Sequence, residues 1–313
     1  MPISSHEFEL VGRLRESIEG VIIGKSNAVR LLVAALLARG HVLIEDSPGL
    51  GKTALARSLA RLIDCPFRRI QFTPDLLPSD ITGMTIFDQA SQEFLFKPGP
   101  VFSSIVLADE INRSTPRIQS ALLEAMNERQ VSYDGKTHPL PEPFMVIATQ
   151  NPTEFIGTYP LPESQLDRFL MRLKLGFPNS QEEYNILLSR RHGDPVESLK
   201  PVIGMSEVVH LIGLTPDIRI EDSVTRYIVE LAQRSRSYAS VSTGVSPRGT
   251  LHLAASAQGL AFVEGRDYVV PDDVKTVAPF VLAHRIVVRN DGHPGGTAGL
   301  EIINQLLRKV PAP

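Results

Sequence analysis

Short apolar runs alternate with helical patterns over the first half of the chain, an order that is typical of a parallel α/β sheet. Runs such as Ile105-Val106-Leu107 are continuously apolar, so we expect strands that are covered on both faces. Strands are expected at His41–Glu45, Phe67–Phe72, Ser104–Ala108, Phe144–Thr149 and Met171–Leu175. Helical patterns separate them at Asn27–Arg39, Thr53–Ile63, Pro116–Arg129 and Ser164–Phe169.

Two segments of this half predict hairpins that are inserted into the α/β unit. Residues Gly83–Val101 alternate apolar and polar positions around a polar turn at Asp88–Gln92. Residues Gln130–Pro143 alternate in the same way ahead of a turn at Asp134-Gly135, a dipeptide that favours tight hairpin turns.

After about Pro201 the pattern becomes helical. Helices are expected at Ser206–Gly213, Glu221–Ser235, Pro247–Val263, Pro271–His284 and Thr297–Lys309. A length of 313 residues also favours two structural units over one. The sequence therefore predicts an α/β core over residues 1–193, followed by a smaller all-α domain over residues 201–313.

Composition is that of an ordinary globular protein, with 42% hydrophobic residues, 21% charged residues and a net charge of −3. Binding to nucleic acid or to an anionic membrane is disfavoured, because no basic excess is present. The longest apolar run, Leu31–Ala38, is far shorter than the roughly 20 residues that span a bilayer. We expect a cytoplasmic protein without membrane insertion. The single cysteine, Cys65, excludes a disulfide within the chain.

The loop Asp46–Thr53 lies directly between a predicted strand and a predicted helix, which is the setting of a phosphate-binding loop. Glycines allow the backbone N–H groups to face phosphate oxygens, Lys52 would neutralise phosphate charge, and Thr53 would bind Mg²⁺. A glycine-rich turn without a ligand is the alternative. Asp46 stands where the usual pattern has glycine. The predicted ATP-binding residues are Asp46, Ser47, Pro48, Gly49, Leu50, Gly51, Lys52, Thr53 and Ala54.

Asp109 and Glu110 end a predicted buried strand, where unpaired carboxylates would be costly without a function. Beside a phosphate loop, Asp109 would hold Mg²⁺ and Glu110 would act as the general base that polarises the attacking water. Asn151 follows another strand and would orient that water. The alternative for Asn151 is a turn-forming residue before Pro152.

Together these motifs resemble the AAA+ class, and their wording resembles the MoxR family within it. The resemblance extends over nearly the whole chain, from Val21 to Pro313, and an aspartate at the first loop position is familiar in that family. Its most specific segments are His41–Thr53, Leu107–Arg113, Ser120–Met126, Ala148–Pro152 and Gly157–Phe169. It implies a P-loop NTPase core of the AAA+ type, a parallel sheet flanked by helices, followed by a helical lid.

The resemblance also implies roles for residues outside these motifs. Arg168 matches the arginine finger that reaches into a neighbouring subunit's site, and Arg113 is a second candidate for such a contact. Arg248 matches the second sensor, which is carried on the lid and contacts the γ-phosphate. A surface ion pair is the alternative for Arg168 and Arg113. The residues that match the adenine-binding segment are Ile22, Ile23 and Gly24.

Members of the family form rings, usually hexamers, that hydrolyse Mg-ATP. The resemblance implies a chaperone-like remodeller that acts on a protein client in complex maturation or metal insertion, with a von Willebrand factor A domain partner. The alternatives are a nucleic-acid-remodelling motor and a nucleotide-dependent switch with little hydrolysis. The hairpins resemble inserts that face the ring pore or a partner. At the second tip, Lys136 lies near Asp134, which favours a solvated turn over a DNA contact.

Overall fold

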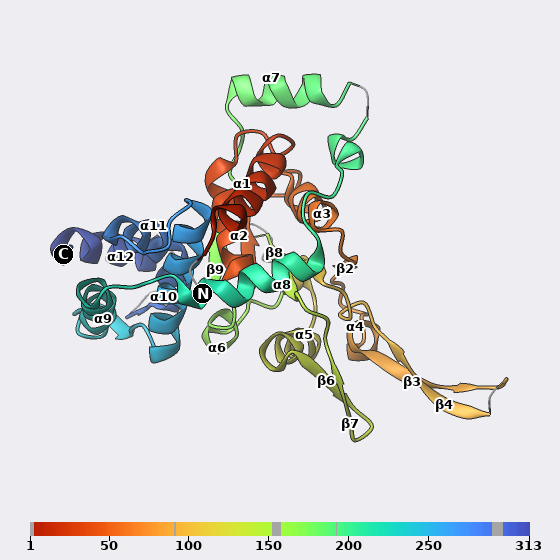
Figure 1. Cartoon of the computed structure of the whole chain (residues 1–313). Helices are drawn as coiled ribbons and strands as arrows, with labels where there is room; N and C mark the ends of the chain where they lie inside the picture. The colour runs from red at the N-terminus through yellow and green to blue at the C-terminus, as the bar shows by residue number, and fades with distance from the viewer. Residues whose placement is uncertain (1–2, 91, 152–157, 192, 290–296) are drawn as a thin grey trace. The chain divides into compact units, whose positions relative to one another are not determined.

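The computed structural model describes residues 3–90, 92–151, 158–191, 193–289 and 297–313 (Figure 1). Contacts between Cα atoms divide the chain into two units. The first unit comprises Met1–Val42, Pro162–Leu173 and Ser206–Pro313, and the second comprises Leu43–Leu161 and Lys174–Met205. The division of the chain near residues 193–201 stays a prediction.

The second unit contains a parallel sheet, as expected. Its strands β2 (Phe67–Gln71), β5 (Ile105–Asp109), β8 (Met145–Gln150) and β1 (Val42–Glu45) are neighbours in that order. In the parallel register Gln71 lies opposite Asp109, and Ala108 lies opposite Ala148. The carboxyl ends of the central strands therefore lie at one edge of the sheet. Helices α3 (Lys52–Ile63) and α5 (Pro116–Glu128) belong to the same unit.

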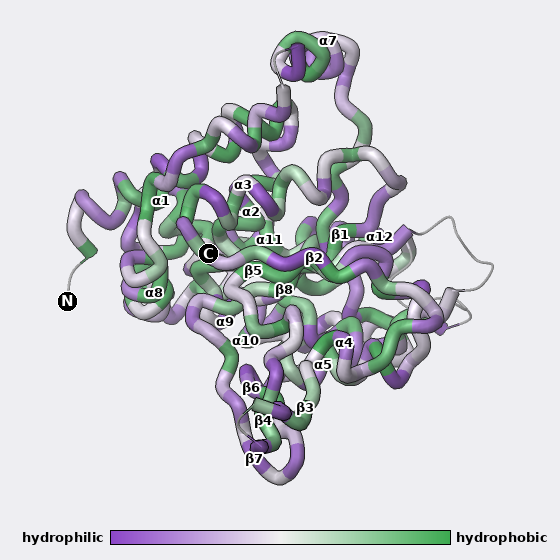
Figure 2. Tube along the Cα trace, turned by 90° about the vertical axis from the view of Figure 1, so that its right-hand side faces the viewer, coloured by the Kyte–Doolittle hydropathy of each residue, from purple (hydrophilic) through white to green (hydrophobic). Residues whose placement is uncertain are grey.

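The central strands are buried because their sequences are apolar on both faces. Every residue of β5 is buried, and so is every residue of β8 except Gln150 at its end. Figure 2 shows the hydrophobic colour along both strands. Asp109, the last residue of β5, is thus a carboxylate at the end of a buried apolar strand.

Both predicted hairpins are present and project from this unit (Figure 1). Strands β3 (Gly83–Asp88) and β4 (Glu93–Pro98) form the first, and β6 (Gln130–Tyr133) and β7 (Lys136–Pro139) form the second. The ring of His138 stacks on that of Phe96, with ring centroids 4.0 Å apart and an angle of 17° between planes. The two hairpins therefore contact each other. The short helix α4 (Pro78–Thr82) precedes the first.

Helix α7 (Ser180–Ser189) of the second unit was not predicted from the sequence. None of its residues is buried, so the periodic apolar face that reveals most helices is missing. Its start is instead fixed locally, because Asn179 and Glu182 form a reciprocal capping box.

The first unit is mainly helical. Its helices are α1 (Ser5–Glu19), α2 (Ser26–Leu37), α6 (Glu163–Leu166), α8 (Met205–Leu214), α9 (Asp222–Arg236), α10 (Pro247–Val263), α11 (Pro271–Leu282) and α12 (Thr297–Lys309). The predicted bounds of α10 and α12 are confirmed. Helices α2 and α10 pack closely, since a Cβ atom on Gly259 would lie 2.4 Å from the carbonyl oxygen of Ala34.

Short strands accompany these helices. Strand β9 (Met171–Leu173) follows Leu170, whose N–H donates to the carbonyl of His41 at 2.8 Å. Strands β10 (Val241–Thr243) and β11 (Val287–Val288) pair antiparallel, which corrects the expectation that this region is entirely helical. Two- and three-residue strands are too short to produce an alternating pattern in the sequence. None of the described helices combines the length and apolarity needed to cross a membrane.

Candidate functional site

A cavity of about 400 Å³ lies in the second unit, where the loop after β1 meets the carboxyl ends of β5 and β8. Ligands of open α/β sheets bind at this edge, and the volume is within the range of small-molecule sites. The lining residues are Pro48, Gly49, Gly51, Lys52, Thr53, Ala54, Arg57, Arg69, Asp109, Glu110, Asn151, Arg190 and Asp194.

The loop is shaped by two glycines in the left-handed region. Gly49 has φ 86° and Gly51 has φ 90°, and a Cβ atom on either would meet no atom within 4 Å. Glycine is therefore required by the backbone conformation and not by lack of space. Helix α3 begins directly afterwards, so its free N–H groups and positive dipole end face the cavity.

The ammonium of Lys52 lies over this loop. Its Nζ donates to the carbonyl oxygens of Asp46 at 2.5 Å and Ser47 at 3.3 Å. Burial lowers the pKa of Lys52, and the charges of Asp46, Asp109 and Glu110 oppose that shift. A half-buried ammonium that is bonded to neutral carbonyls can exchange these partners for an anion.

Asp46 has a different position from the one expected of a ligand-binding residue. Its carboxylate accepts hydrogen bonds from the N–H groups of Leu175 and Gly176, the latter at 3.3 Å. The side chain thus anchors the start of the loop to the segment after β9. Glycine could not make these bonds, which gives a physical reason for aspartate at this position. Ser47 and Leu50 complete the loop.

Asp109 is held from two sides. One carboxylate oxygen accepts the hydroxyl of Thr149 at 2.5 Å, and the other accepts Nε and Nη2 of Arg69 at 3.0 and 2.6 Å. Arg69 is on β2, and its side chain is 50% exposed whereas that of Asp109 is 13% exposed. The carboxylate is consequently paired with a cation from its own chain.

Glu110 follows with a left-handed backbone, φ 58° and ψ 49°, which is unusual for glutamate. Its N–H donates to Thr149 Oγ1 at 2.9 Å, which helps to hold this conformation. Its carboxylate accepts Nε2 of Gln71 at 2.6 Å and Nη1 of Arg113 at 3.0 Å. The unusual backbone turns Glu110 towards the cavity, although its side chain is engaged by two neighbours.

Asn151 is 5% exposed and lines the same cavity after β8. Its carbonyl accepts Nδ2 of Asn112 at 3.5 Å. The structure therefore brings together Lys52, Asp109 and Glu110 with Asn151, which are widely separated in the sequence.

Several polar residues that line the cavity were not predicted from the sequence. Arg69 of β2 is one of them, and Gln71, two residues further along the strand, contacts Glu110. The available signal was a strand that carries polar residues at alternate positions. Arg190 follows the unpredicted helix α7, so no signal placed it here. Arg57 forms an ion pair with Asp194 at 3.2 Å.

The donor atoms suit a magnesium ion. The Thr53 hydroxyl and the Asp109 carboxylate supply the hard oxygen ligands that Mg²⁺ prefers. Among the described residues no group of three or more His, Cys, Asp or Glu side chains is arranged to hold a metal. Magnesium is commonly held by one or two carboxylates together with water and substrate phosphates.

The other predicted residues belong to the first unit. Ile22 is buried and Gly24 has φ 75° in the connection between α1 and α2. Arg168 is half-buried, and its guanidinium forms no ion pair within the described part of the chain. Arg248 is exposed in the first turn of α10, which Ser246 caps by accepting the N–H of Gly249 at 3.1 Å.

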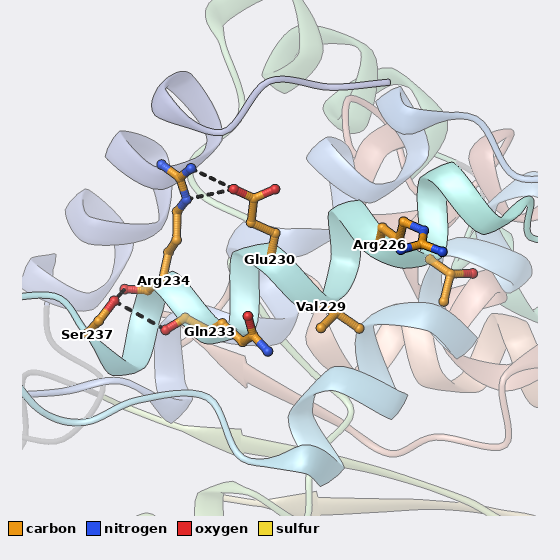
Figure 3. A pocket seen from close by; sticks show the side chains of 7 residues that line it. Arg226, Val229, Glu230, Gln233, Arg234 and Ser237 are labelled. Carbon is orange, nitrogen blue, oxygen red and sulfur yellow. Dashed lines mark hydrogen bonds and ion pairs between the residues drawn. The ribbon is translucent and has the colours of Figure 1, made fainter.

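A second hollow, of about 600 Å³, follows one face of α9 (Figure 3). Arg234 and Glu230 turn towards one another there at 2.6 Å, and Arg226 pairs with Asp222 at 2.7 Å. These charges are satisfied by neighbours one turn away, as on a solvated helix face. We assign no ligand to this hollow.

The phosphate-loop geometry, the acidic strand end and the helical first unit define an ATPase of the AAA+ class. Residues 41–171 match the ATPase family associated with various cellular activities (AAA). Residues 233–305 match the AAA lid domain. The predicted fold class is thereby confirmed.

Similarity to known proteins identifies the family within this class. The chain is 48% identical to the uncharacterized protein YeaC of Bacillus subtilis, over 97% of this chain and 95% of YeaC. It is 40% identical to Chaperone MoxR1 of Mycobacterium tuberculosis, over 95% of this chain and 80% of MoxR1. A crystal structure from Cytophaga hutchinsonii, described as an inferred ATPase, has a TM-score of 0.90 and 37% identity, and the match covers 98% and 96% of the two chains. The chain belongs to the MoxR family of AAA+ ATPases.

Proposed function

We propose that this protein binds Mg-ATP in the cavity of the α/β unit and hydrolyses it. One observation carries the proposal. Lys52 and Thr53 of the phosphate loop line the same cavity as Asp109, Glu110 and Asn151. Membership of an ATPase family supports it.

In this proposal the loop from Pro48 to Ala54 binds the phosphates through its backbone N–H groups, and Lys52 exchanges its carbonyl partners for the β- and γ-phosphates. Thr53 and Asp109 would hold Mg²⁺, which supplies charge neutralisation on the phosphates when it is bound. Asp46 would act indirectly, by anchoring the start of the loop through Leu175 and Gly176.

Glu110 would accept a proton from the attacking water, and Asn151 would orient that water. One oxygen of the Glu110 carboxylate accepts from both Gln71 and Arg113, so these two side chains restrain its orientation. In this account the observed arrangement is a resting state in which the base is restrained.

Arg168 would reach the site of a neighbouring subunit in a homo-oligomeric, hexameric ring. Two features support Arg168 over Arg113 as this finger. Arg113 pairs with Glu110 of its own chain, whereas Arg168 forms no ion pair within the described residues. Arg248 would contact the γ-phosphate from the lid, and the segment Ile22–Gly24 would bind adenine.

The cellular role would be chaperone-like remodelling of a protein client, in complex maturation or metal insertion and with a von Willebrand factor A domain partner. The name of Chaperone MoxR1 and the family relationship support the chaperone-like part. A nucleic-acid motor is less well supported. The net charge is −3, and the imidazole of His138 near the hairpin tip is already stacked on Phe96.

The test is Mg-ATP turnover by the purified chain, compared with Glu110→Gln. A matched control is Glu124→Gln, because Glu124 is an exposed glutamate on α5 of the same unit. We expect ATP hydrolysis by the wild type and by Glu124→Gln. We expect Glu110→Gln to bind ATP without hydrolysing it. Tight binding without turnover in all three would favour the nucleotide-dependent switch instead.

A further inference from the structure

Arg285 is a buried arginine in the first unit, at the end of the turn that follows α11. Its side chain is 2% exposed. Its Nε donates to the carboxylate of Asp167 at 2.8 Å, and Nη2 donates to the carbonyl of Phe169 at 2.7 Å and to that of Asp167 at 3.2 Å. The guanidinium thus holds the backbone and side chain on both sides of Arg168. A buried charge persists only when it is paired in this way.

Nη1 of Arg285 also donates to the carbonyl oxygens of Leu170, at 3.4 Å, and Val281. Two histidines lie against the same guanidinium. Nη2 lies 2.6 Å from Nδ1 of His252, and Nη1 lies 2.6 Å from Nε2 of His284. A guanidinium can only donate hydrogen bonds, so the ring nitrogens that face it act as acceptors and both rings are neutral. In this tautomer Nε2 of His284 does not donate to the carbonyl oxygen of Phe169, which lies 3.3 Å away. With this assignment Nδ1 of His284 carries the proton, and it is buried without a partner among the described residues. The histidines therefore fix the orientation of Arg285 at some cost.

Arg285 also packs against the first turn of α10. A Cβ atom on Gly249 would lie 2.9 Å from Cδ of Arg285, so the glycine leaves room for this side chain. Gly249 is the residue after Arg248, and His252 is one turn further along the same helix. One side chain consequently contacts the segment that carries Arg168 and the helical turn that carries Arg248.

We propose that Arg285 is a positioning residue that couples Arg168 to Arg248. The inference rests on the proposed function, in which Arg168 completes a neighbour's site and Arg248 senses the phosphate of its own. Rate-enhancing contacts require positioning within about 0.5 Å, which a loop attains only when other groups hold it. A shift of the first turn of α10 is transmitted through Arg285 to the Arg168 segment, and the finger then responds to the nucleotide of its own subunit.

A double-mutant cycle tests the coupling. Steady-state turnover and the affinity for a fluorescent ADP analogue are measured for the wild type, Arg168→Ala, Arg285→Gln and the double variant. We expect Arg285→Gln to lower kcat at least about tenfold, with ADP affinity within about twofold of wild type. In the double variant, turnover falls no further than in Arg168→Ala, because Arg285 acts through Arg168.

The matched control is Arg266→Gln, which breaks another largely buried ion pair of the same unit, that with Asp273 at 2.6 Å. We expect its fold-change in kcat to multiply with that of Arg168→Ala in the double variant, because the two residues act independently. If Arg285→Gln does not fold, Gly249→Ala takes its place in the cycle, because the added methyl group would lie 2.9 Å from both Cδ of Arg285 and Cγ1 of Val245, so it displaces these side chains and leaves all charges intact.

The coupling would be overturned if the Arg168→Ala and Arg285→Gln substitutions lowered kcat independently. Their fold-decreases in kcat would then multiply in the double variant, as those of Arg168→Ala and Arg266→Gln are expected to do. Wild-type turnover in a folded Arg285→Gln protein would also overturn it, and would leave the proposed finger untouched. Wild-type turnover in Arg168→Ala would instead remove the proposed finger itself, and the coupling with it.

Discussion

The pairing of Arg69 with Asp109 leads to a prediction about magnesium. Two guanidinium nitrogens at 3.0 and 2.6 Å engage one oxygen of the carboxylate that would hold the metal. Arg69 is therefore a competitor for the metal ligand. Replacing it in Arg69→Gln should lower the magnesium concentration needed for half-maximal ADP binding.

The magnitude follows from the exposure of the pair. The Arg69 side chain is 50% exposed, so the interaction is screened by solvent. Exposed ion pairs contribute about 0.2–1 kcal/mol, and two hydrogen bonds to the carboxylate place this one near the upper end. About 1 kcal/mol corresponds to a roughly fivefold decrease in the half-maximal magnesium concentration.

The assay is a titration of magnesium into a fixed mixture of protein and a fluorescent ADP analogue, which avoids hydrolysis. Arg68→Gln is the matched control, because it removes the same charge from the preceding residue of β2, which is also exposed. It should change the magnesium requirement less than Arg69→Gln. An increased magnesium requirement in Arg69→Gln would refute the reasoning, since it would mean that Arg69 helps the metal to bind. An equal decrease of the half-maximal magnesium concentration in both variants would mean that the loss of a positive charge, and not the contact with Asp109, causes the change.

Further predictions concern binding and stability. Lys52→Ala should weaken ATP binding at least about a hundredfold, because two charge-assisted bonds of about 1.5–3 kcal/mol each are lost, and calorimetry will measure this. Asp46→Ala should lower the free energy of unfolding by about 1–3 kcal/mol in urea titrations, because it leaves the N–H groups of Leu175 and Gly176 without their acceptor. Burial, and then the charges of Arg285, Arg248 and His41, lower the pKa of His252 to about 3. The unfolded chain protonates this histidine below about pH 6.5 and the folded chain does not, so His252 alone should lower the free energy of unfolding by about 1.4 kcal/mol per pH unit from pH 6.5 towards pH 3. His284 shifts in the same direction. His252→Asn keeps an acceptor for Arg285 and should show a shallower loss between pH 6.5 and 5, and equal slopes would contradict this cause.

Much of the fold could be predicted because its signals are local. Continuous apolar runs marked β5 and β8, and a Pro start marked α10. The helix α7 could not be found in this way, since it buries no residue. The strands β10 and β11 are three and two residues long, and their pairing depends on the tertiary structure.

The candidate site divides in the same manner. The loop with Lys52 and the pair Asp109–Glu110 could be predicted, because each directly follows an apolar strand that the sequence reveals. Arg69 and Gln71 meet these acidic residues only through the register of β2 against β5, which no local pattern encodes. The role of Asp46 was also inaccessible, because its partners Leu175 and Gly176 lie far along the chain.

The central claim is that ATP is hydrolysed at a site that a neighbouring subunit completes. Mixing two inactive variants tests it most directly. Glu110→Gln lacks the base but retains Arg168, and Arg168→Ala lacks the finger but retains Glu110. Each alone should turn over ATP at a rate reduced by about 10³ or more, whereas a mixture should recover a substantial part of wild-type turnover at sites that combine both residues. Turnover in the mixture equal to the average of the two separate variants, with oligomers shown to exchange subunits, would contradict the shared site.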